Sequence, residues 1–491
     1  MRDIIFTFFN YFVFFYTSML AIFFVTFAFL SFISLKRRKD YYVESYMRKT
    51  IKESPYTPGI SVIAPAFNEE KTIIDNVNSM LALEYPLFEV VIVNDGSTDS
   101  TLKKMIEHYE LIEVPYAYIE RIKTKPFRRL FKSTSPKYSR LIVVDKENGG
   151  TKADASNAGI NVSSYPYFIC TDVDCILEKY ALYRCISPII SSDKQVIAVS
   201  GTMLMANGCV VKDGQIVDVR TPRTPIPLFQ NLEYMRSYLI GKMGWSAING
   251  MPNVSGGFGL FDRSVAIAAG GYDGTSFAED MDLITRMVGY MCDFSRPYKI
   301  VQIPDTCCWT EGPPNLAMLY RQRTRWARGL FQTLNIHRKM IFKKTYKQMG
   351  LLTLPYMFVF EFLAPIIELV GLIVFIYLAF TGAVNWNTAW MIYLTIYTFC
   401  QFLSIVVITY DYYVGMLYKR GYEYLWIIIA SILEPIFYHP IITFCSLRGY
   451  LSYLTNRDFK WKNMERKGFK QKEENTDDAE TAAMKPEPAT I

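Results

Sequence analysis

The sequence Tyr167-Phe-Ile-Cys-Thr-Asp172-Val-Asp174 places two carboxylates directly after a short apolar run. We predict that the apolar run Tyr167–Thr171 is a buried β-strand that delivers Asp172 and Asp174 into a loop. Two hard oxygen ligands at a strand end suit Mg²⁺ or Mn²⁺ bridging a diphosphate. The spacing alone is a weak signal, because it also occurs in ordinary capped turns, so the surrounding segments decide its meaning.

Those segments repeat a pattern of a short apolar strand followed by a helix. Further strands are predicted at residues 60–64, 89–93 and 141–144. Asn68 is expected to cap the helix after the first strand, and Thr98 or Asp99 the helix after the second. The alternation predicts an α/β domain with a mostly parallel sheet, in which ligands bind at the carboxyl ends of strands. Four acidic residues fall at such ends: Asp95, Asp145, Asp172 and Asp174.

Composition divides the chain into membrane segments and a soluble part. Of the 491 residues, 51% are hydrophobic and 20% are charged, which fits neither an ordinary soluble enzyme nor a chain lying wholly in a bilayer. Residues 4–35 carry no charge and exceed the roughly 20 apolar residues that a spanning helix needs. Because basic residues stay on the cytoplasmic side, the Lys-Arg-Arg-Lys sequence at 36–39 places the following domain in the cytoplasm.

Three more apolar stretches follow the soluble part, at residues 351–380, 386–410 and 424–445. Three crossings would put the tail outside, whereas its basic residues at 460–472 favour the cytoplasm. We therefore expect a cytoplasmic tail and one stretch that is interfacial or re-entrant, with the beginning of the first stretch as the candidate.

Counts of charges and of reactive residues exclude several kinds of site. A net charge of +7, from 53 basic and 46 acidic residues, does not indicate nucleic-acid binding. The nine cysteines form no CxxC pair and are expected to be reduced core residues, and the three scattered histidines argue against a zinc site. Since neither GxGxxG after the first strand nor GxxxxGK[ST] occurs, a bound nucleotide would need a metal ion at its phosphates.

Two further clusters carry candidate chemistry. Glu279-Asp280-Met-Asp282 opens an apparent helix, where acids either compensate the helix dipole or supply a general base for an acceptor hydroxyl. The run Arg321-Gln-Arg-Thr-Arg-Trp326 suits phosphate binding and stacking on a sugar, or is a basic helix at the membrane interface.

Seven segments in this order resemble the processive family 2 glycosyltransferases, which include cellulose, chitin, hyaluronan and poly-N-acetylglucosamine synthases. The segments begin at Ser61 (SVIAPAFNE), Val93 (VNDGSTD), Asn148 (NGGTKADASN), Asp172 (DVD), Ser255 (SGGFGLF), Glu279 (ED) and Gln322 (QRTRW). The resemblance covers about residues 58 to 330 and implies a GT-A type nucleotide-sugar transferase domain, Rossmann-like, inserted between transmembrane helices.

The resemblance also implies a role for each matching residue. Phe67, Glu69 and Asp95 would hold the uracil and ribose, Lys152 would approach the diphosphate, and Asp172 would contact the nucleotide. Asp174 would ligate Mg²⁺ or Mn²⁺, and Asp280 would be the catalytic base. The diphosphate and the acceptor end of the glycan would be bound by Glu279, Gln322, Arg325 and Trp326.

The function implied is inverting transfer from a UDP-sugar to a growing β-linked polysaccharide, coupled to translocation across the membrane. UDP-N-acetylglucosamine is favoured over UDP-glucose, because no substantial soluble domain follows the last apolar stretch, unlike cellulose synthases with a C-terminal nucleotide-sensing barrel. The alternatives are non-processive transfer to a membrane lipid and an inactive glycan exporter or scaffold. Expected partners are the donor, the glycan acceptor, the lipid bilayer and accessory subunits of an export system, but no nucleic acid.

The expected organisation is a multi-pass protein of the cell (inner) membrane. It comprises a transmembrane segment at 1–39, a cytoplasmic glycosyltransferase domain at 40–345, about three membrane segments at 346–447, and a basic, then disordered tail at 448–491. Two stretches depart from the family pattern. Residues 121–140 carry eight Lys/Arg and no acid and are expected to be a solvated or membrane-facing loop, or a regulatory or partner site; residues 209–227 are expected to form a β-hairpin and loop.

Overall fold

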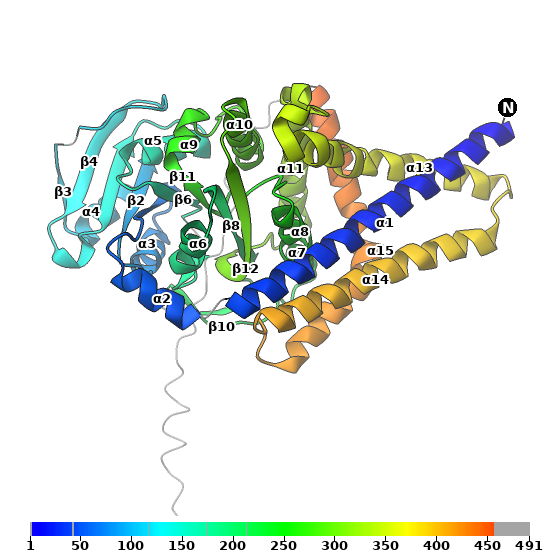
Figure 1. Ribbon diagram of the computed structural model, residues 1–491, viewed down its shortest axis with the longest axis horizontal. Coiled ribbons are helices and arrows are strands. Elements are labelled where there is room, and N and C mark those ends of the chain that lie inside the picture. The colour runs from blue at the N-terminus through cyan, green and yellow to red at the C-terminus, as the bar shows by residue number, and fades with distance from the viewer. Residues whose placement is uncertain (1, 42–43, 116, 174, 213, 456–491) are drawn as a thin grey trace, which may run out of the picture.

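The computed structural model describes residues 2–41, 44–115, 117–173, 175–212 and 214–455. Its soluble domain is built on a ten-stranded sheet with the order β3-β4-β5-β2-β1-β6-β11-β8-β12-β7 (Figure 1). The strands are β1 (Ile60–Ala66), β2 (Phe88–Asp95), β3 (Leu111–Glu113), β4 (Phe127–Ser133), β5 (Leu141–Lys146), β6 (Tyr167–Thr171), β7 (Ile176–Leu177), β8 (Gln195–Met205), β11 (Phe258–Asp262) and β12 (Tyr298–Thr310).

The sheet is mixed but mostly parallel, as the alternating pattern predicted. Following the pairings across the sheet, seven of the ten strands point the same way, and only β4, β7 and β11 are reversed. The predicted strands at 60–64, 89–93, 141–144 and 167–171 correspond to β1, β2, β5 and β6. These four strands lie side by side at the centre of the sheet, where near-continuous burial explains their unbroken apolar sequences.

Most helices of the soluble domain come directly after a strand in the sequence. They are α2 (Glu44–Glu53), α3 (Ile73–Leu81), α4 (Thr101–His108), α5 (Lys152–Val162), α6 (Ala181–Ile190), α7 (Pro225–Arg236), the π-helical turn η2 (Ser237–Lys242), α8 (Met243–Ala247), α9 (Arg263–Ala268), α10 (Glu279–Asp293) and α11 (Leu316–Ile336). Helix α10 begins at Glu279, as expected from its acidic first turn, and buries Leu283, Ile284 and Met287.

The predicted cap at Asn68 is wrong, because Thr72 occupies the N-cap position of α3. Asn68 instead adopts a positive φ of 57°, which asparagine tolerates, and its side chain accepts a hydrogen bond from the Thr98 backbone N–H at 2.8 Å. Helix α4 likewise follows Ser100 rather than Thr98 or Asp99, although Asp99 Oδ1 accepts from the Thr101 N–H at 2.9 Å. These side chains join the loops that follow β1 and β2.

The prediction of a loop at residues 121–140 is also wrong. Strand β4 and a short 3₁₀ turn, η1 (Pro136–Tyr138), occupy much of it, and β4 pairs with β5 while burying Leu130 and Phe131. The basic side chains remain exposed, and Figure 1 places this edge at the opposite end of the sheet from the long apolar helices. The predicted hairpin at 209–227 is confirmed as β9 (Val210–Lys212) and β10 (Gln215–Asp218), but helix α7 begins at Pro225.

Four helical segments of the described chain are long and apolar enough to cross a membrane: Tyr11–Arg37 within α1 (Arg2–Tyr41), Met349–Phe380, α14 (Trp386–Val414) and α15 (Gly421–Leu454). The second consists of the π-helical turns η5 (Met349–Thr353) and η6 (Met357–Phe362), the short α12 (Leu354–Tyr356) between them, and α13 (Ala364–Phe380). The tail predicted at 448–491 begins within α15, and its residues beyond 455 lie outside the described residues.

The long helices gather on one side of the sheet and pack against α1, although they are distant from it in sequence (Figure 1). Tyr410 of α14 donates a hydrogen bond to the Ala28 carbonyl at 2.5 Å, and Tyr16 of α1 packs against Phe360. Two ionisable residues of the apolar helix α15 have protein partners. Glu434 pairs with Arg236 at 2.7 Å, and His439 pairs with Glu368 at 3.1 Å.

Helix α11 lies between these long helices and the rest of the soluble domain. A Cβ added at Gly449 of α15 would meet the Thr324 carbonyl oxygen at 2.6 Å, and one at Gly329 of α11 would meet the Ala278 Cβ at the same distance. Both glycines therefore allow backbones to approach closely. One helix thus touches α15 on one face and the start of α10 on another.

Candidate active site

The parallel strands β2, β1 and β6 end at the same edge of the sheet: Asp95 is the last residue of β2, and Phe67 and Asp172 directly follow β1 and β6. Phe67 is half-buried in the loop after β1. Glu69 follows it, with its backbone N–H donating to Thr101 Oγ1 at 2.8 Å and its carboxylate accepting from Thr72 at 3.1 Å. The sheet therefore brings to one edge the residues that were expected to hold the nucleotide.

Asp95 is buried, and its own counter-ion lies beside it. Lys146 Nζ lies 2.8 Å from Asp95 Oδ1 and 2.5 Å from Asp154 Oδ2, and the Gly149 N–H donates to Asp95 at 3.0 Å. Lys146 is 1% exposed and was missed in the sequence, where its position directly after the apolar part of β5 was the available signal. Asp95 thus fixes the glycine loop at 148–150 as well as facing this edge.

Asp145 does not belong to the site, although it falls at the end of β5. Its carboxylate accepts from Asn94 Nδ2 at 2.8 Å and from Arg129 Nη2 at 2.9 Å. Both partners belong to neighbouring strands, so Asp145 stabilises the sheet.

Lys152 and Asp172 form an ion pair of 2.6 Å, and Lys152 also donates to the Gly256 carbonyl at 2.6 Å. Burial by itself lowers the pKa of Lys152, but the Asp172 carboxylate outweighs it, so the pKa lies above the usual value of a lysine. The Asp172 side chain remains 38% exposed at the end of β6. A fixed positive charge and a partly exposed carboxylate therefore stand side by side where a diphosphate is expected.

One pocket of about 540 Å³ brings three of the predicted residues together: Lys152, Glu279 and Arg325. The start of α5 forms one wall of the pocket, and residues 274–277 form another. Arg325 Nη1 lies 3.9 Å from Glu279 Oε2. Burial raises the pKa of Glu279, while the nearby Arg325 works against that shift. Cations from two distant helices thus line a cavity large enough for a nucleotide sugar's diphosphate.

Asp280 is held next to this pocket by backbone donors. The Gly256 N–H donates to Asp280 Oδ2 at 3.0 Å, and the Met281 N–H donates to Oδ1 at 2.9 Å. The same glycine accepts from Lys152, so the turn before β11 connects the predicted base to the predicted diphosphate ligand. A carboxylate fixed in this way is suited to accept a proton from a hydroxyl group.

Asp282 supports the start of α10 and does not line the pocket. It is 2% exposed and is bound by Arg286 Nε at 2.8 Å and by His337 Nε2 at 2.8 Å. Burial raises the pKa of Asp282, but these two partners more than reverse that effect and hold it below the usual value. The ionised carboxylate fixes the first turn of α10 against the end of α11.

The side chains of the basic run in the middle of α11 lie on two faces of the helix. Arg325 lines the pocket, whereas Gln322 accepts from Gln230 of α7 at 3.0 Å. The guanidinium of Arg323 lies 4.4 Å above the Trp326 ring and binds both carboxylate oxygens of Glu233, at 2.7 and 2.6 Å. Arg325 thus lines the pocket, whereas Gln322 contacts α7 and Trp326 packs against Arg323.

Gln332 was missed in the sequence, where no motif marks it. Its side-chain oxygen accepts from the Phe277 N–H at 2.9 Å, and its nitrogen donates to the Thr275 carbonyl at 3.0 Å. Together with Gly329 it fixes the loop 274–278 that lines the pocket.

The residues present fit a divalent cation in part. The Asp172 carboxylate is a hard oxygen donor at a strand end beside the pocket, as Mg²⁺ or Mn²⁺ requires. Asp174, the predicted ligand, lies outside the described residues, and among the residues described no group of three His, Cys, Asp or Glu could hold a metal. A diphosphate would therefore have to complete the coordination.

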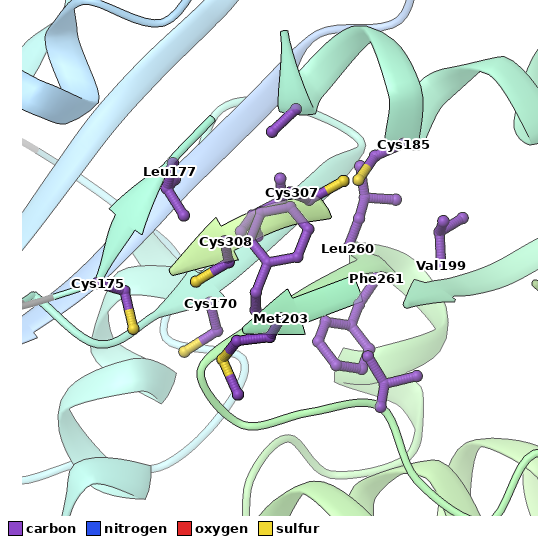
Figure 2. Close-up of a cluster of buried hydrophobic side chains, with 14 of the residues drawn as sticks. Cys170, Cys175, Leu177, Cys185, Val199, Met203, Leu260, Phe261, Cys307 and Cys308 are labelled. Atoms are coloured by element: carbon purple, nitrogen blue, oxygen red, sulfur yellow. The ribbon is translucent and has the colours of Figure 1, made fainter. Parts of the chain in front are cut away.

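Behind Asp172 the core is rich in cysteine, and Figure 2 shows Cys170, Cys175, Cys307 and Cys308 among its apolar side chains. All nine cysteines of the chain are free, as predicted, and all except Cys209 and Cys400 are buried. Burial raises the pKa of the Cys170 and Cys308 thiols, so these groups are neutral. The strand that carries Asp172 therefore rests on an uncharged layer.

Comparison with known families finds two matching models. Residues 61–203 match "Glycosyl transferase family 2", and residues 222–444 match "Glycosyl transferase family group 2". The two regions together include every residue singled out above for the site, Asp174 among them.

Curated relatives include poly-β-1,6-N-acetyl-D-glucosamine synthases of two staphylococci. The protein of Staphylococcus aureus (strain COL) is 29% identical over 278 residues, which is 56% of this chain and 55% of that protein. The protein of Staphylococcus epidermidis is 27% identical over 282 residues, 57% of each chain. The match thus spans about half the length of these relatives.

Among solved structures, the mannosyltransferase PcManGT from Pyrobaculum calidifontis, in complex with GDP-Man and Mn²⁺, is 16% identical with a TM-score of 0.48. The similarity covers 89% of this chain and 100% of that chain.

Proposed function

We propose, from the premise that this chain belongs to glycosyltransferase family 2 and has its GT-A fold, that it transfers sugars from a UDP-sugar to a growing polysaccharide. The observation that carries the proposal is the junction at Gly256. Its carbonyl accepts a hydrogen bond from Lys152, a cation of the pocket, and its N–H donates one to Asp280, the predicted base. The residue proposed to bind the donor diphosphate and the residue proposed to activate the acceptor hydroxyl are therefore both hydrogen-bonded to Gly256.

In the transfer, the acceptor hydroxyl attacks the anomeric carbon of the donor and gives its proton to Asp280. The bond from that carbon to the diphosphate breaks as the new glycosidic bond forms on the opposite face, so the configuration inverts. Lys152 and Arg325 bind the departing diphosphate and offset its negative charge. Asp95 holds the adjoining glycine loop in place, and Phe67 and Glu69 contact the nucleoside.

A divalent ion, Mg²⁺ or Mn²⁺, supplies additional positive charge to the diphosphate when bound. Asp172 and Asp174 are the residues that would hold it. EDTA should abolish transfer, and added Mg²⁺ or Mn²⁺ should restore it; full turnover in EDTA would contradict this part of the proposal.

The favoured donor is UDP-N-acetylglucosamine, with UDP-glucose next. The staphylococcal relatives support this choice by name, since they are N-acetylglucosamine polymer synthases. In this proposal the protein lies in the cell membrane, and residues 40–345 form its catalytic domain on the cytoplasmic side. Membrane segments at 1–39 and 346–447 flank this domain, and a tail follows at 448–491. The close packing of α11 on α15 supports passage of the glycan from the site to the membrane helices, with accessory subunits of an export system as further partners.

The test is to incubate membranes that contain the protein with labelled UDP-sugars, one at a time, and to size the products. A polymer is expected with one donor, and Trp326→Ala is expected to shorten it while donor binding survives. A single labelled glycolipid would instead identify the non-processive alternative, and no product from any donor would identify an inactive exporter or scaffold.

A further inference from the structure

The segment between α11 and the apolar segment Met349–Phe380 is basic and exposed, and the reaction described above does not use it. Residues 338–348 contain no acid, and their basic side chains are all exposed: Arg338, Lys339, Lys343, Lys344 and Lys347. Two 3₁₀ turns, η3 (Arg338–Met340) and η4 (Lys344–Tyr346), fold this basic segment. Its charges therefore lie within a few residues of the point where an apolar helix begins.

A second segment, residues 293–299, lies beside the basic segment and enlarges its surface. The two are in contact where Lys347 Nζ lies 5.7 Å from the ring centroid of Tyr298. The second segment contributes one acid and two bases, all exposed: Asp293, Arg296 and Lys299. The joint surface thus has a strong excess of positive charge.

Two phenylalanines are exposed among these charges. Phe342 is 72% exposed, and Phe294 is 62% exposed. Phe342 has a φ of 61°, which bulky residues rarely adopt, and its N–H donates to the Gly350 carbonyl at 2.8 Å. A Cβ at Gly350 would meet the Lys343 carbonyl oxygen at 2.5 Å, so this turn is folded tightly against the first residues of the apolar segment. The protein thus holds a large apolar side chain outward in a strained backbone conformation, which is typical of functional positions.

Basic side chains interspersed with exposed apolar ones are typical of protein surfaces that lie on a bilayer. Lys and Arg attract anionic headgroups, while aromatic and aliphatic side chains enter the boundary with the acyl chains. Leu351 and Leu352 are also exposed and continue the apolar part of this surface into the apolar segment. Figure 1 shows the chain that follows α11 next to the start of the long apolar helices, at the opposite end of the sheet from β3 and β4. A small soluble anion could use only the charges of this surface, whereas a lipid leaflet would use both its charges and its apolar side chains.

We infer that the surface formed by residues 338–348 and 293–299 binds the headgroups of anionic phospholipids in the adjoining leaflet. The inference goes beyond the proposed function and requires only that the apolar helices cross a bilayer. His337, directly before the basic segment, binds Asp282 in the first turn of α10 at 2.8 Å. The lipid-binding surface is thereby connected to the helix that begins with Glu279 and Asp280.

The experiment places the full-length protein in nanodiscs of phosphatidylcholine, with and without phosphatidylglycerol, and follows hydrogen–deuterium exchange by mass spectrometry. Peptides that cover residues 338–348 and 293–299 should exchange more slowly when phosphatidylglycerol is present. Strand β4 is the internal control, because it is also basic but lies at the other end of the sheet, and its exchange should not change. This comparison uses the wild type and does not depend on the folding of any variant.

Two variants separate the charged and the apolar contributions. Each lysine near an anionic surface contributes about fivefold in affinity, so Lys343→Gln/Lys344→Gln should weaken headgroup binding about 25-fold and remove the slowing. Phe342→Ser should weaken binding about tenfold, because an apolar side chain no longer enters the bilayer. Lys125→Gln/Arg128→Gln removes two exposed charges from the other basic edge and is the matched control; it should retain the slowing.

Three outcomes would overturn the inference. The first is equal exchange with and without phosphatidylglycerol in the wild type. The second is the same slowing by inorganic phosphate in neutral nanodiscs, which would identify a site for small anions. The third is slowing that appears only after removal of residues 473–491, which would assign the surface to this acidic stretch of the chain. None of these results bears on the proposed function, which fails only if no UDP-sugar tested supports transfer.

Discussion

Between residues 60 and 171 the ion pairs of Asp95 and Asp145 have both partners within the same region, whereas three arginines beyond residue 220 bind side chains of the long apolar helix α15. In the first region Lys146 joins Asp95 and Asp154, and Arg129 joins Asp145. In the second region the pairs are Arg223 with Glu423, Arg236 with Glu434, and Arg323 with Glu233 and Tyr438. The buried charge network of the first region is therefore complete in itself, while that of the second region is connected to the membrane helices.

Asp280→Asn should have the largest effect, because it should greatly lower transfer while leaving donor binding intact. The amide keeps the shape of the carboxylate but cannot accept the proton, so transfer should fall about 10²–10⁴-fold. Donor binding, which depends on the first region and the pocket cations, should remain near that of the wild type in a titration with UDP-sugar. Near-normal transfer would move the role of base to Glu279.

Arg323→Ala should remove the hydrogen bonds that connect α11 to α7 and α15. Arg323 is 7% exposed and Glu233 33%, and losing hydrogen bonds to a charged group typically costs about 1.5–3 kcal/mol. Thermal unfolding of the detergent-purified protein should therefore begin at a lower temperature. Arg321→Ala, an exposed residue two positions earlier on the same helix, is the control and should unfold like the wild type.

Gly329→Ala should disturb the contact between α11 and the pocket. The new methyl group would lie 2.6 Å from the Ala278 Cβ and 2.9 Å from its backbone nitrogen, so the loop before Glu279 has to move. Overpacking of this kind costs about 1–3 kcal/mol, and we expect it to appear as reduced transfer activity. Gly371→Ala on α13, where a Cβ meets nothing within 4 Å, should retain full activity.

Arg129→Ala should have the smallest effect. Arg129 is 45% exposed, and Asp145 keeps its hydrogen bond from Asn94 when the arginine is removed. Pairs with an exposed partner contribute less than about 1 kcal/mol, so unfolding temperature and activity should change little. A loss as large as that of Arg323→Ala would show that the first region is not complete in itself.

The sequence predicted the first region well, because its signals are local. Each central strand is a continuous apolar run, and each candidate acid follows directly after one, so β1, β2, β5 and β6 and the positions of Asp95 and Asp172 could be inferred. The incorrect predictions in this region concern the helix caps and the outer part of the sheet. Asn68 bonds to the neighbouring loop rather than to its own helix, and β4 carries too much charge to be recognised as a strand until it pairs with β5.

The second region depends on contacts that no local pattern reveals. The sequence marked Arg321 to Trp326 as a basic run, but it did not show that Arg323 and Arg325 face different partners. Gln332 was missed because its partners come from a segment distant in sequence: it holds a loop more than 50 residues earlier.

The order in which the chain is made gives these distant pairings a further consequence. Thr221 and Glu423 are 202 residues apart, and Glu233 and Tyr438 are 205 apart. At about 5–20 residues per second, a ribosome needs roughly 10–40 s to add that length. The first region can fold soon after it emerges, while Arg223, Glu233 and Arg236 wait without their later partners until α15 has been synthesised. During each round of synthesis the nascent chain thus passes through a stage in which these residues of the second region lack their partners, and insertion of the last helix supplies them.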